Sequence, residues 1–264
     1  MRVSVSVASM LPYTEAGEGD AVLLIHAGIA DRSMWDEHLG WLARAGFRAI
    51  AVDLPGFGEA PVQDGPQAPW EDVLQTLRDL DISRAALVGN SFGGAVALRI
   101  AAVAPAAVTA MALISSPAPG LEPSPRLRAV WEAEEAALDA GDVDAAVDAI
   151  VDGWTLPDAS DALRQRVATM QRRALELQLA APEPSEAPDP VEEHPEVLER
   201  LAVRTLAAAG EYDMSDFIEG AQQLAQTLPD ARYVTIAGAG HLAPLETPEA
   251  FERLLREFLV GSDS

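Results

Sequence analysis

Three side chains of the types used in nucleophilic catalysis stand out in the sequence: Ser91, Asp213 and His241. A serine hydroxyl is a weak nucleophile until a histidine accepts its proton, and a carboxylate must hold that histidine in the right orientation. We therefore predict a catalytic triad in which Ser91 attacks an acyl carbon, His241 is the base and Asp213 orients His241. Because the three lie far apart in the sequence, the fold must bring them together.

Ser91 lies in the segment Gly89-Asn90-Ser91-Phe92-Gly93-Gly94, between an apolar run that predicts a strand and an alanine-rich run that predicts a helix. A serine on such a sharp turn takes a strained backbone conformation, which requires glycine two positions before and after it. The pattern Gly-x-Ser-x-Gly also occurs in ordinary tight turns. The strand before it and the helix after it favour the catalytic interpretation, with the amide of Phe92 directed toward a bound group at the helix N-terminus.

The chain has only four histidines, so the candidates for the base are few. His38 lies in a predicted helix, and we expect it at the surface or in packing. His194 lies in a proline-rich acidic segment, where we expect it to be solvated. For His26, which follows a predicted strand, we expect a structural hydrogen bond. His241 lies on a glycine-flanked loop after the last predicted strand, which suits a mobile but directed base.

The orienting acid has several candidates. Asp213 follows the next-to-last predicted strand and should lie at the same edge of the sheet as the other two members of the triad. Its rivals are Glu211, which comes early on the loop, and Asp216, which we expect to cap the following helix. Asp53 could also reach this edge, but its Pro-Gly neighbours indicate a structural turn.

The elements that must position these residues alternate along most of the chain. After a strand or hairpin expected within 2–13, strands are predicted at 21–25, 48–52, 85–89, 108–114, 203–209 and 232–236, with helices between them. This order is typical of an α/β protein with a mostly parallel sheet and right-handed crossovers. Ligands bind such sheets at the carboxyl ends of the strands.

Between residues 118 and 200 the pattern changes. No strand is predicted there, and three amphipathic helices precede a proline-rich acidic linker at 181–195. We expect Trp131, Trp154 and Met170 to pack these helices together. The sequence thus predicts a core formed by 1–117 and 201–264, with 118–200 inserted as a helical cap.

Composition narrows the classes of function. The 264 residues are 49% hydrophobic, enough for one sizeable α/β domain. The absence of cysteine excludes disulfides and thiol nucleophiles, and the absence of lysine excludes Schiff-base chemistry. A formal net charge of −24 argues against nucleic acid and anionic membranes as partners. No signal peptide or membrane-spanning run is evident, so we expect a cytoplasmic protein.

In chain order, the motifs resemble those of the α/β-hydrolase fold family over nearly the whole length. The resemblance rests on His26-Ala27-Gly28 with Trp35 nine residues after His26, the turn around Ser91, Gly210-Glu211-Tyr212-Asp213, and Gly240-His241. It implies an eight-stranded sheet with helices on both faces, a helical cap and a covalent acyl-enzyme intermediate.

The resemblance also implies an oxyanion hole, which we assign to the amides of Gly28 and Phe92. Many relatives have His-Gly where this chain has His26-Ala27-Gly28, so Ile29 is an alternative second donor. Ile29 and Leu242 are also expected to contact substrate. No metal site or dinucleotide-binding fingerprint is found, so we expect neither metal nor cofactor.

These features predict a hydrolase of carboxylic esters whose partner is a small-molecule ester, acting as a monomer or homodimer. The turn around Ser91 also resembles that of hydrolases that cleave carbon–carbon bonds of ring-fission products, although those commonly have an aromatic residue where this chain has Leu242. Two further alternatives are a ligand-binding protein without turnover and a lyase without a cofactor.

Overall fold

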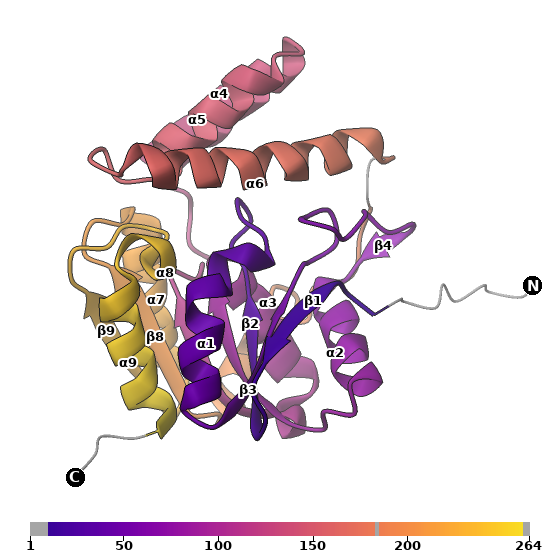
Figure 1. Ribbon diagram of the computed structural model, residues 1–264, viewed down its shortest axis with the longest axis vertical. Coiled ribbons are helices and arrows are strands. Elements are labelled where there is room, and N and C mark those ends of the chain that lie inside the picture. Colours follow the sequence, from indigo (N-terminus) through magenta and orange to yellow (C-terminus); the bar gives the residue numbers. More distant parts are fainter. Residues whose placement is uncertain (1–9, 183–184, 261–264) are drawn as a thin grey trace, which may run out of the picture.

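The computed structural model describes residues 10–182 and 185–260, and its centre is a mostly parallel sheet (Figure 1). Seven strands lie in the order β1-β3-β2-β5-β6-β8-β9, with β1 antiparallel to β3 and every other neighbouring pair parallel. The strands are β1 (Tyr13–Ala16), β2 (Asp20–Ile25), β3 (Phe47–Val52), β5 (Ala85–Asn90), β6 (Val108–Ile114), β8 (Thr205–Gly210) and β9 (Ala231–Ile236). The α/β class is therefore confirmed.

The strand count differs from the expected eight, since seven strands form this sheet in the described residues. The strand or hairpin expected at 2–13 falls largely on residues 1–9, which lie outside the described part of the chain. Tyr13 begins β1, the antiparallel edge strand.

Helices cover both faces of the sheet because successive residues of each strand point to opposite sides. In β2, Val22 and Leu24 join a core cluster with α1 and α9, whereas Leu23 and Ile25 join a second cluster with α2, α3 and α7. The helices are α1 (Asp36–Arg44, preceded by a 3-10 turn at Arg32–Trp35), α2 (Pro69–Asp79), α3 (Phe92–Val103), α7 (Ser215–Thr227), α8 (Ala243–Glu246) and α9 (Pro248–Val260). Further 3-10 turns span Pro105–Ala107 and Pro195–Arg200.

Three more helices lie beyond the carboxyl ends of the strands, as Figure 1 shows. They are α4 (Pro125–Asp139), α5 (Val143–Trp154) and α6 (Asp161–Ala180), and they match the three helices predicted in this part of the chain. Ser124, Asp142 and Ser160 cap their N-termini through side-chain oxygens.

The expectation that residues 118–200 contain no strand is wrong. The two-residue strand β7 (Ser185–Glu186) pairs in parallel with β4 (Pro66–Gln67). Flanking prolines, which cannot donate a backbone hydrogen bond, obscure so short a pairing in the sequence. The pairing fastens the segment after α6 to the sheet domain.

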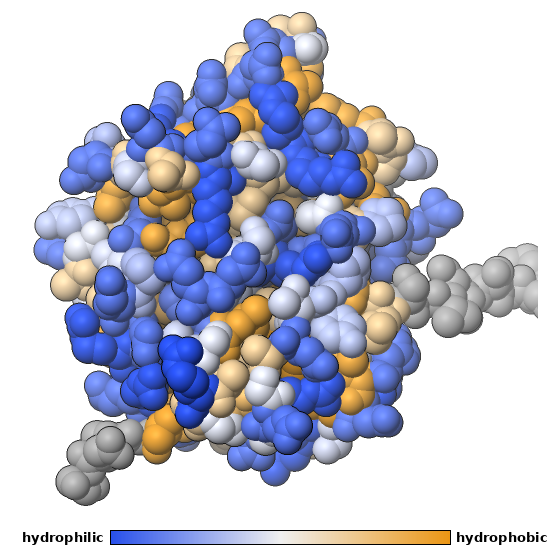
Figure 2. Space-filling model, in the orientation of Figure 1, coloured by the Kyte–Doolittle hydropathy of each residue, from blue (hydrophilic) through white to orange (hydrophobic). Residues whose placement is uncertain are grey.

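None of the helices in the described residues is long and apolar enough to cross a membrane. The face seen in Figure 2 is mostly hydrophilic, with apolar side chains in small separate patches. This surface agrees with the large excess of acidic residues in the composition.

Candidate active site

Ser91 occupies a strained turn between β5 and α3. Its backbone has φ 54° and ψ −117°, a combination that residues other than glycine rarely adopt. The Ser91 amide donates to the carbonyl of Ile114 in β6 at 2.8 Å, which holds the turn at the carboxyl edge of the sheet. A Cβ at Gly89 would collide with the backbone of Gly93, and a Cβ at Gly93 would collide with the carbonyl of Ile25. The flanking glycines are therefore required by close packing.

His241 and Asp213 form a buried hydrogen bond. The distance from His241 Nδ1 to Asp213 Oδ1 is 3.0 Å, and the same oxygen accepts the amide of Met214 at 2.8 Å. Since an ionised carboxylate can only accept, Nδ1 carries the proton and Nε2 of His241 is left as an acceptor. The pair thus has the tautomer that a histidine needs to act as a base through Nε2.

The two loops that carry this pair are joined directly. A Cβ at Gly210 would collide with the carbonyl of Gly240, so glycine is needed where the loops touch. Glu211 accepts the amide of Gly238 at 3.0 Å through its carboxylate. Glu211, a rival of Asp213 in the sequence, therefore holds the two loops together.

Asn90 connects the turn at Ser91 to the loop of His241. Its side-chain amide donates to the carbonyl oxygens of His241 and Ile114, each at 3.1 Å. Asn90 is fully buried and immediately precedes Ser91. The structure thus brings the turn that carries Ser91 beside the loop that carries His241.

The ring of His241 packs against two aromatic rings that also contact each other. Its centroid lies 4.5 Å from that of Trp154 in α5 and 4.2 Å from that of Phe217 in α7. Both aromatic residues line the same cavity as Ser91. No hydrogen bond joins the Ser91 hydroxyl to the His241 ring in the described residues. In enzymes without substrate such bonds are often long and tighten only in the complex.

The other buried histidines have both ring nitrogens engaged. In His26, Nε2 accepts the amide of Leu54 at 2.9 Å, so Nδ1 donates to the carbonyl of Ala27 at 2.8 Å. Burial lowers the pKa of His26, although the nearby acids act in the opposite direction. These contacts fit the structural role predicted for His26.

His38 is buried, so the surface position allowed by the sequence is wrong and the packing alternative holds. Its Nδ1 accepts the indole N–H of Trp41 at 3.2 Å, and its Nε2 donates to the carbonyl of Pro244 at 2.9 Å. Burial lowers its pKa as well. His194 is exposed, as expected. Among the four histidines, His241 alone combines burial with an Nε2 that has no protein partner in the described residues.

Asp53 is a structural residue. Its buried carboxylate pairs with the guanidinium of Arg32 and accepts the backbone amides of Arg32 and Glu59, both at 2.8 Å. This geometry agrees with the structural turn predicted around Asp53.

Asp216 does not cap the helix that follows it, contrary to expectation. The N-cap of α7 is Met214, and Asp216 lies within the first turn. Its Oδ1 instead accepts the amide of Ser124 at 2.6 Å, at the start of α4. The sequence does not reveal this contact because the partner lies in a distant helical segment.

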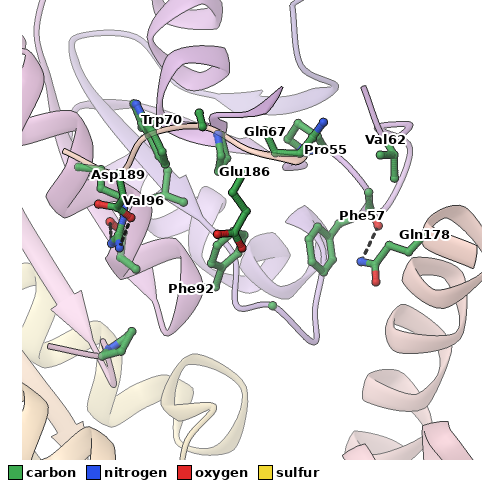
Figure 3. Close-up of a pocket in the computed structure, with 17 residues that line it drawn as sticks. Pro55, Phe57, Val62, Gln67, Trp70, Phe92, Val96, Gln178, Glu186 and Asp189 are labelled. Carbon is green, nitrogen blue, oxygen red and sulfur yellow. Dashed lines mark hydrogen bonds and ion pairs between the residues drawn. The ribbon is translucent and has the colours of Figure 1, made fainter. Parts of the chain in front are cut away.

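Two cavities flank Phe92. The smaller, about 400 Å³, contains Ser91 and is lined by Trp131, Trp154, Phe217 and Asp216, among others. The larger, about 580 Å³, lies toward β4 and β7 (Figure 3). In that view Phe57, Phe92 and Trp70 surround it, and the Glu186 side chain extends into it. Phe92 and Pro117 line both cavities.

The predicted oxyanion donors come together at the larger cavity. Gly28 and Phe92 both line it, and a Cβ at Gly28 would lie 3.5 Å from Cβ of Phe92. Phe92 begins α3, where first-turn amides have no partner within the helix. Among the described residues, the amides of Gly28, Ile29 and Phe92 donate to no backbone carbonyl. Gly28 and Ile29 therefore both remain candidates for the second donor.

The charges at the cavities are mostly acidic. Glu186 lines the larger cavity, and Glu122 and Asp216 line the smaller. The one arginine at either cavity in the described residues, Arg99, is engaged by Asp189 at 2.6 Å. No group of three or more His, Asp or Glu side chains in the described part of the chain could hold a metal ion.

Several residues lie elsewhere than the sequence indicates. Met170 and Trp154 are buried and pack in the core cluster as expected, and Trp154 also lines the smaller cavity. The packing role expected for Trp131 is wrong, because Trp131 is exposed and lines the smaller cavity. Ile29 and Leu242, predicted to contact substrate, are buried in the core and line neither cavity described here. Helical periodicity shows which face of α5 is apolar. It does not show that the ring of Trp154 packs against the ring of His241.

The chain is similar to known proteins in both sequence and fold. Residues 22–254 match the model of the alpha/beta hydrolase family. A curated relative, the 2-hydroxy-6-oxo-6-(2'-aminophenyl)hexa-2,4-dienoic acid hydrolase of Metapseudomonas resinovorans, is 28% identical over 94% of this chain and 86% of its own length. Two other curated relatives match more locally, and the chain spans 35% and 20% of their lengths.

Solved structures are similar over nearly the whole chain. A thermophilic esterase from Thermogutta terrifontis superposes with a TM-score of 0.80 at 26% identity, covering 95% of this chain and 93% of the esterase. An enol-lactonase from Burkholderia xenovorans LB400 superposes with a TM-score of 0.78 at 25% identity, covering 95% and 96%.

Proposed function

The chain belongs to the alpha/beta hydrolase family, and from this premise we propose that it hydrolyses a carboxylic ester bond of a small-molecule substrate. The observation that carries the proposal is the 3.0 Å bond between His241 Nδ1 and Asp213 Oδ1, which leaves Nε2 free on a loop that Asn90 joins to the turn of Ser91. The similarity to an esterase and an enol-lactonase supports the same class of reaction.

The proposed reaction has two halves. Ser91 Oγ attacks the acyl carbon while Nε2 of His241 takes its proton, and Asp213 stabilises the resulting imidazolium. The amides of Phe92 and Gly28 donate to the oxyanion, and loss of one such donor typically costs about 10² to 10³ in turnover. The carbon–oxygen bond then breaks, and His241 gives its proton to the leaving alcohol. In the second half His241 activates a water that releases the acid from Ser91.

The cavities favour an ester without a negative charge. They are lined mainly by apolar side chains, and the guanidinium at Arg99 is already paired with Asp189. An anionic group there would meet Glu186 or Asp216 without an unpaired arginine to balance it. We assign residues 118–200 as the cap that closes over these cavities, because α4 and α5 supply part of the smaller one.

A second candidate is hydrolysis of a carbon–carbon bond in a ring-fission product. Its support is the similarity over 94% of the chain to the relative from Metapseudomonas resinovorans, whose name describes a dienoic acid hydrolase. Against it stand the acidic linings described above and Leu242, which is fully buried where an aromatic side chain would be expected next to the base. We therefore rank ester hydrolysis first.

The test compares p-nitrophenyl esters of short acids, an uncharged lactone and a vinylogous diketone acid as substrates. The esters or the lactone should be hydrolysed. With the p-nitrophenyl esters, a burst of p-nitrophenol equal to the enzyme concentration should precede steady turnover. Ser91→Ala should abolish the burst, and Asp213→Asn should lower kcat by about 10⁴-fold because it stabilises the wrong tautomer. Ser215→Ala, at an exposed serine of α7, is the control.

Two results would count against the proposal. Unchanged ester turnover in Ser91→Ala would remove Ser91 from the mechanism. Faster cleavage of the diketone acid than of any ester or lactone would establish the second candidate instead.

A further inference from the structure

Glu246 accepts hydrogen bonds from the loop that carries His241. Its Oε2 accepts the amide of Gly240 at 2.8 Å and the amide of Leu242 at 3.2 Å. These N–H groups belong to the two residues that flank His241. One carboxylate oxygen at the end of α8 therefore fixes the backbone immediately before and after the proposed base.

The site around Glu246 is tightly filled. Its other oxygen, Oε1, is shielded from solvent. A Cβ at Gly240 would lie 3.1 Å from Oε1 and 2.9 Å from Cδ2 of Leu156, so a larger residue at position 240 would crowd both groups. The carboxylate is therefore enclosed between the loop of His241 and Leu156.

The charges facing Glu246 come from the neighbouring loops. Burial raises the pKa of its carboxyl, the amides of Gly240 and Leu156 and the nearby His241 act in the opposite direction, and the Asp213 carboxylate adds to the rise. Within the described residues, no arginine forms an ion pair with Glu246. The carboxylate is therefore held by backbone amides and not by a salt bridge.

We propose that Glu246 is a positioning residue, which sets the orientation of His241 by clamping the amides of Gly240 and Leu242. The proposal rests on the proposed function in that it takes His241 as the base. Loss of the clamp would let the loop relax and change the direction of Nε2, and misplacement of a catalytic group by about 1 Å can cost about 10²-fold in rate.

The experiment compares three substitutions at Glu246 with a control. Glu246→Ala removes both acceptor oxygens, Glu246→Gln keeps one acceptor oxygen at the same reach, and Glu246→Asp keeps the charge but is one methylene shorter. Glu249→Ala, at an exposed glutamate three residues later, is the control. For each protein, kcat and KM for a p-nitrophenyl ester and the melting temperature are measured.

We expect Glu246→Ala and Glu246→Asp to lower kcat by about 10- to 100-fold with little change in KM, since substrate contacts are untouched. Glu246→Gln should recover most of kcat, and Glu249→Ala should match the unmodified protein. A residue that stabilises only the fold would change the melting temperature of all three variants without separating kcat from KM.

A second readout does not depend on activity. The Nδ1–H proton of His241 should give a low-field NMR signal that Asp213→Asn removes, and Glu246→Ala should broaden or shift it while Glu246→Gln preserves it. If no ester is hydrolysed but this pattern appears, the proposed function fails and the positioning role stands. If Glu246→Ala does not fold, folded Glu246→Asp with unchanged kcat and an unchanged His241 signal overturns the inference, as the same result in folded Glu246→Ala would.

Discussion

The side-chain amide of Asn90 donates a hydrogen bond to the main-chain oxygen of His241 at 3.1 Å. This bond joins the residue before the proposed nucleophile to the residue proposed as its base. The same amide also donates to the carbonyl of Ile114, so one buried side chain links two loops and the central sheet. Glycine spacing predicts the turn itself, but nothing in the spacing predicts this connection.

Removal of that amide should loosen the site. In Asn90→Ala the carbonyl oxygen of His241 loses this partner and that of Ile114 keeps only the Ser91 amide, which should lower the free energy of unfolding by about 1 to 3 kcal/mol. The turnover of an aryl ester should fall together with it, because the loop of His241 loses one of its anchors. Urea denaturation and kcat measured on the same preparation test both effects.

Gln223→Ala is the comparison, since its amide donates to one main-chain carbonyl, that of Pro119 at 2.9 Å, and neither residue lines the cavity that contains Ser91. It should cost some stability and leave kcat unchanged. If Asn90→Ala lost stability alone, the bond to His241 would have no part in catalysis.

Phe92 separates the two cavities, and its proposed catalytic contribution comes from the backbone amide. Phe92→Ala should therefore keep the hydrolysis of a small acetyl ester while joining the cavities. The ratio of kcat/KM for a bulky naphthyl ester to that for the acetyl ester should rise by about tenfold. Phe57→Ala, which enlarges only the larger cavity, should change the ratio less. An unchanged ratio in Phe92→Ala would show that Phe92 is no barrier.

The contact between Asp216 and Ser124 should depend on pH. Burial raises the pKa of Asp216, but the hydrogen bonds it accepts, first that from the Ser124 amide, outweigh burial and leave the pKa below its ordinary value. A carboxyl whose pKa falls on folding stabilises the native state above its unfolded pKa, and this contribution is lost as the pH falls through the folded pKa.

The difference in unfolding free energy between the unmodified protein and Asp216→Asn should therefore be about 1 kcal/mol near about pH 6 and smaller near about pH 3. Urea denaturation at the two pH values measures it. Asp158→Asn, at an exposed position, should show no such trend, and a difference that grows toward acid pH would contradict the assignment.

Much of the fold follows from patterns that are local in the sequence. Continuous apolar runs predict the buried strands β2, β3, β5 and β6, and helical spacing predicts α4 to α6. The pairing of β4 with β7 is not predictable in this way, because two residues among prolines carry no periodic signal. The two strands are far apart in the sequence and become neighbours only in the folded chain.

The candidate site also has a part that the sequence predicts and a part that it does not. Ser91 and His241 lie in motifs whose glycines mark tight turns, so their place at the edge of the sheet could be predicted. The roles of Trp154 and Phe217 depend on where distant elements meet, which neither spacing nor composition reveals. Glu246 contacts residues only four and six positions away, but no periodic pattern marks that contact. Asp216 shows the same limit, since a cap and a contact with another helix look alike in sequence.

The helical span from α4 to α6 is fastened to the sheet domain at both of its ends. Asp216 holds its beginning at Ser124, and the β4–β7 pairing with the Arg99–Asp189 ion pair holds the chain that leaves it. A chimera that grafts this span from a relative must therefore keep two separate attachment points. Junctions placed before Ser124 and after Asp189 would transfer both halves of each fastening only if positions 66–67, 99 and 216 were exchanged as well.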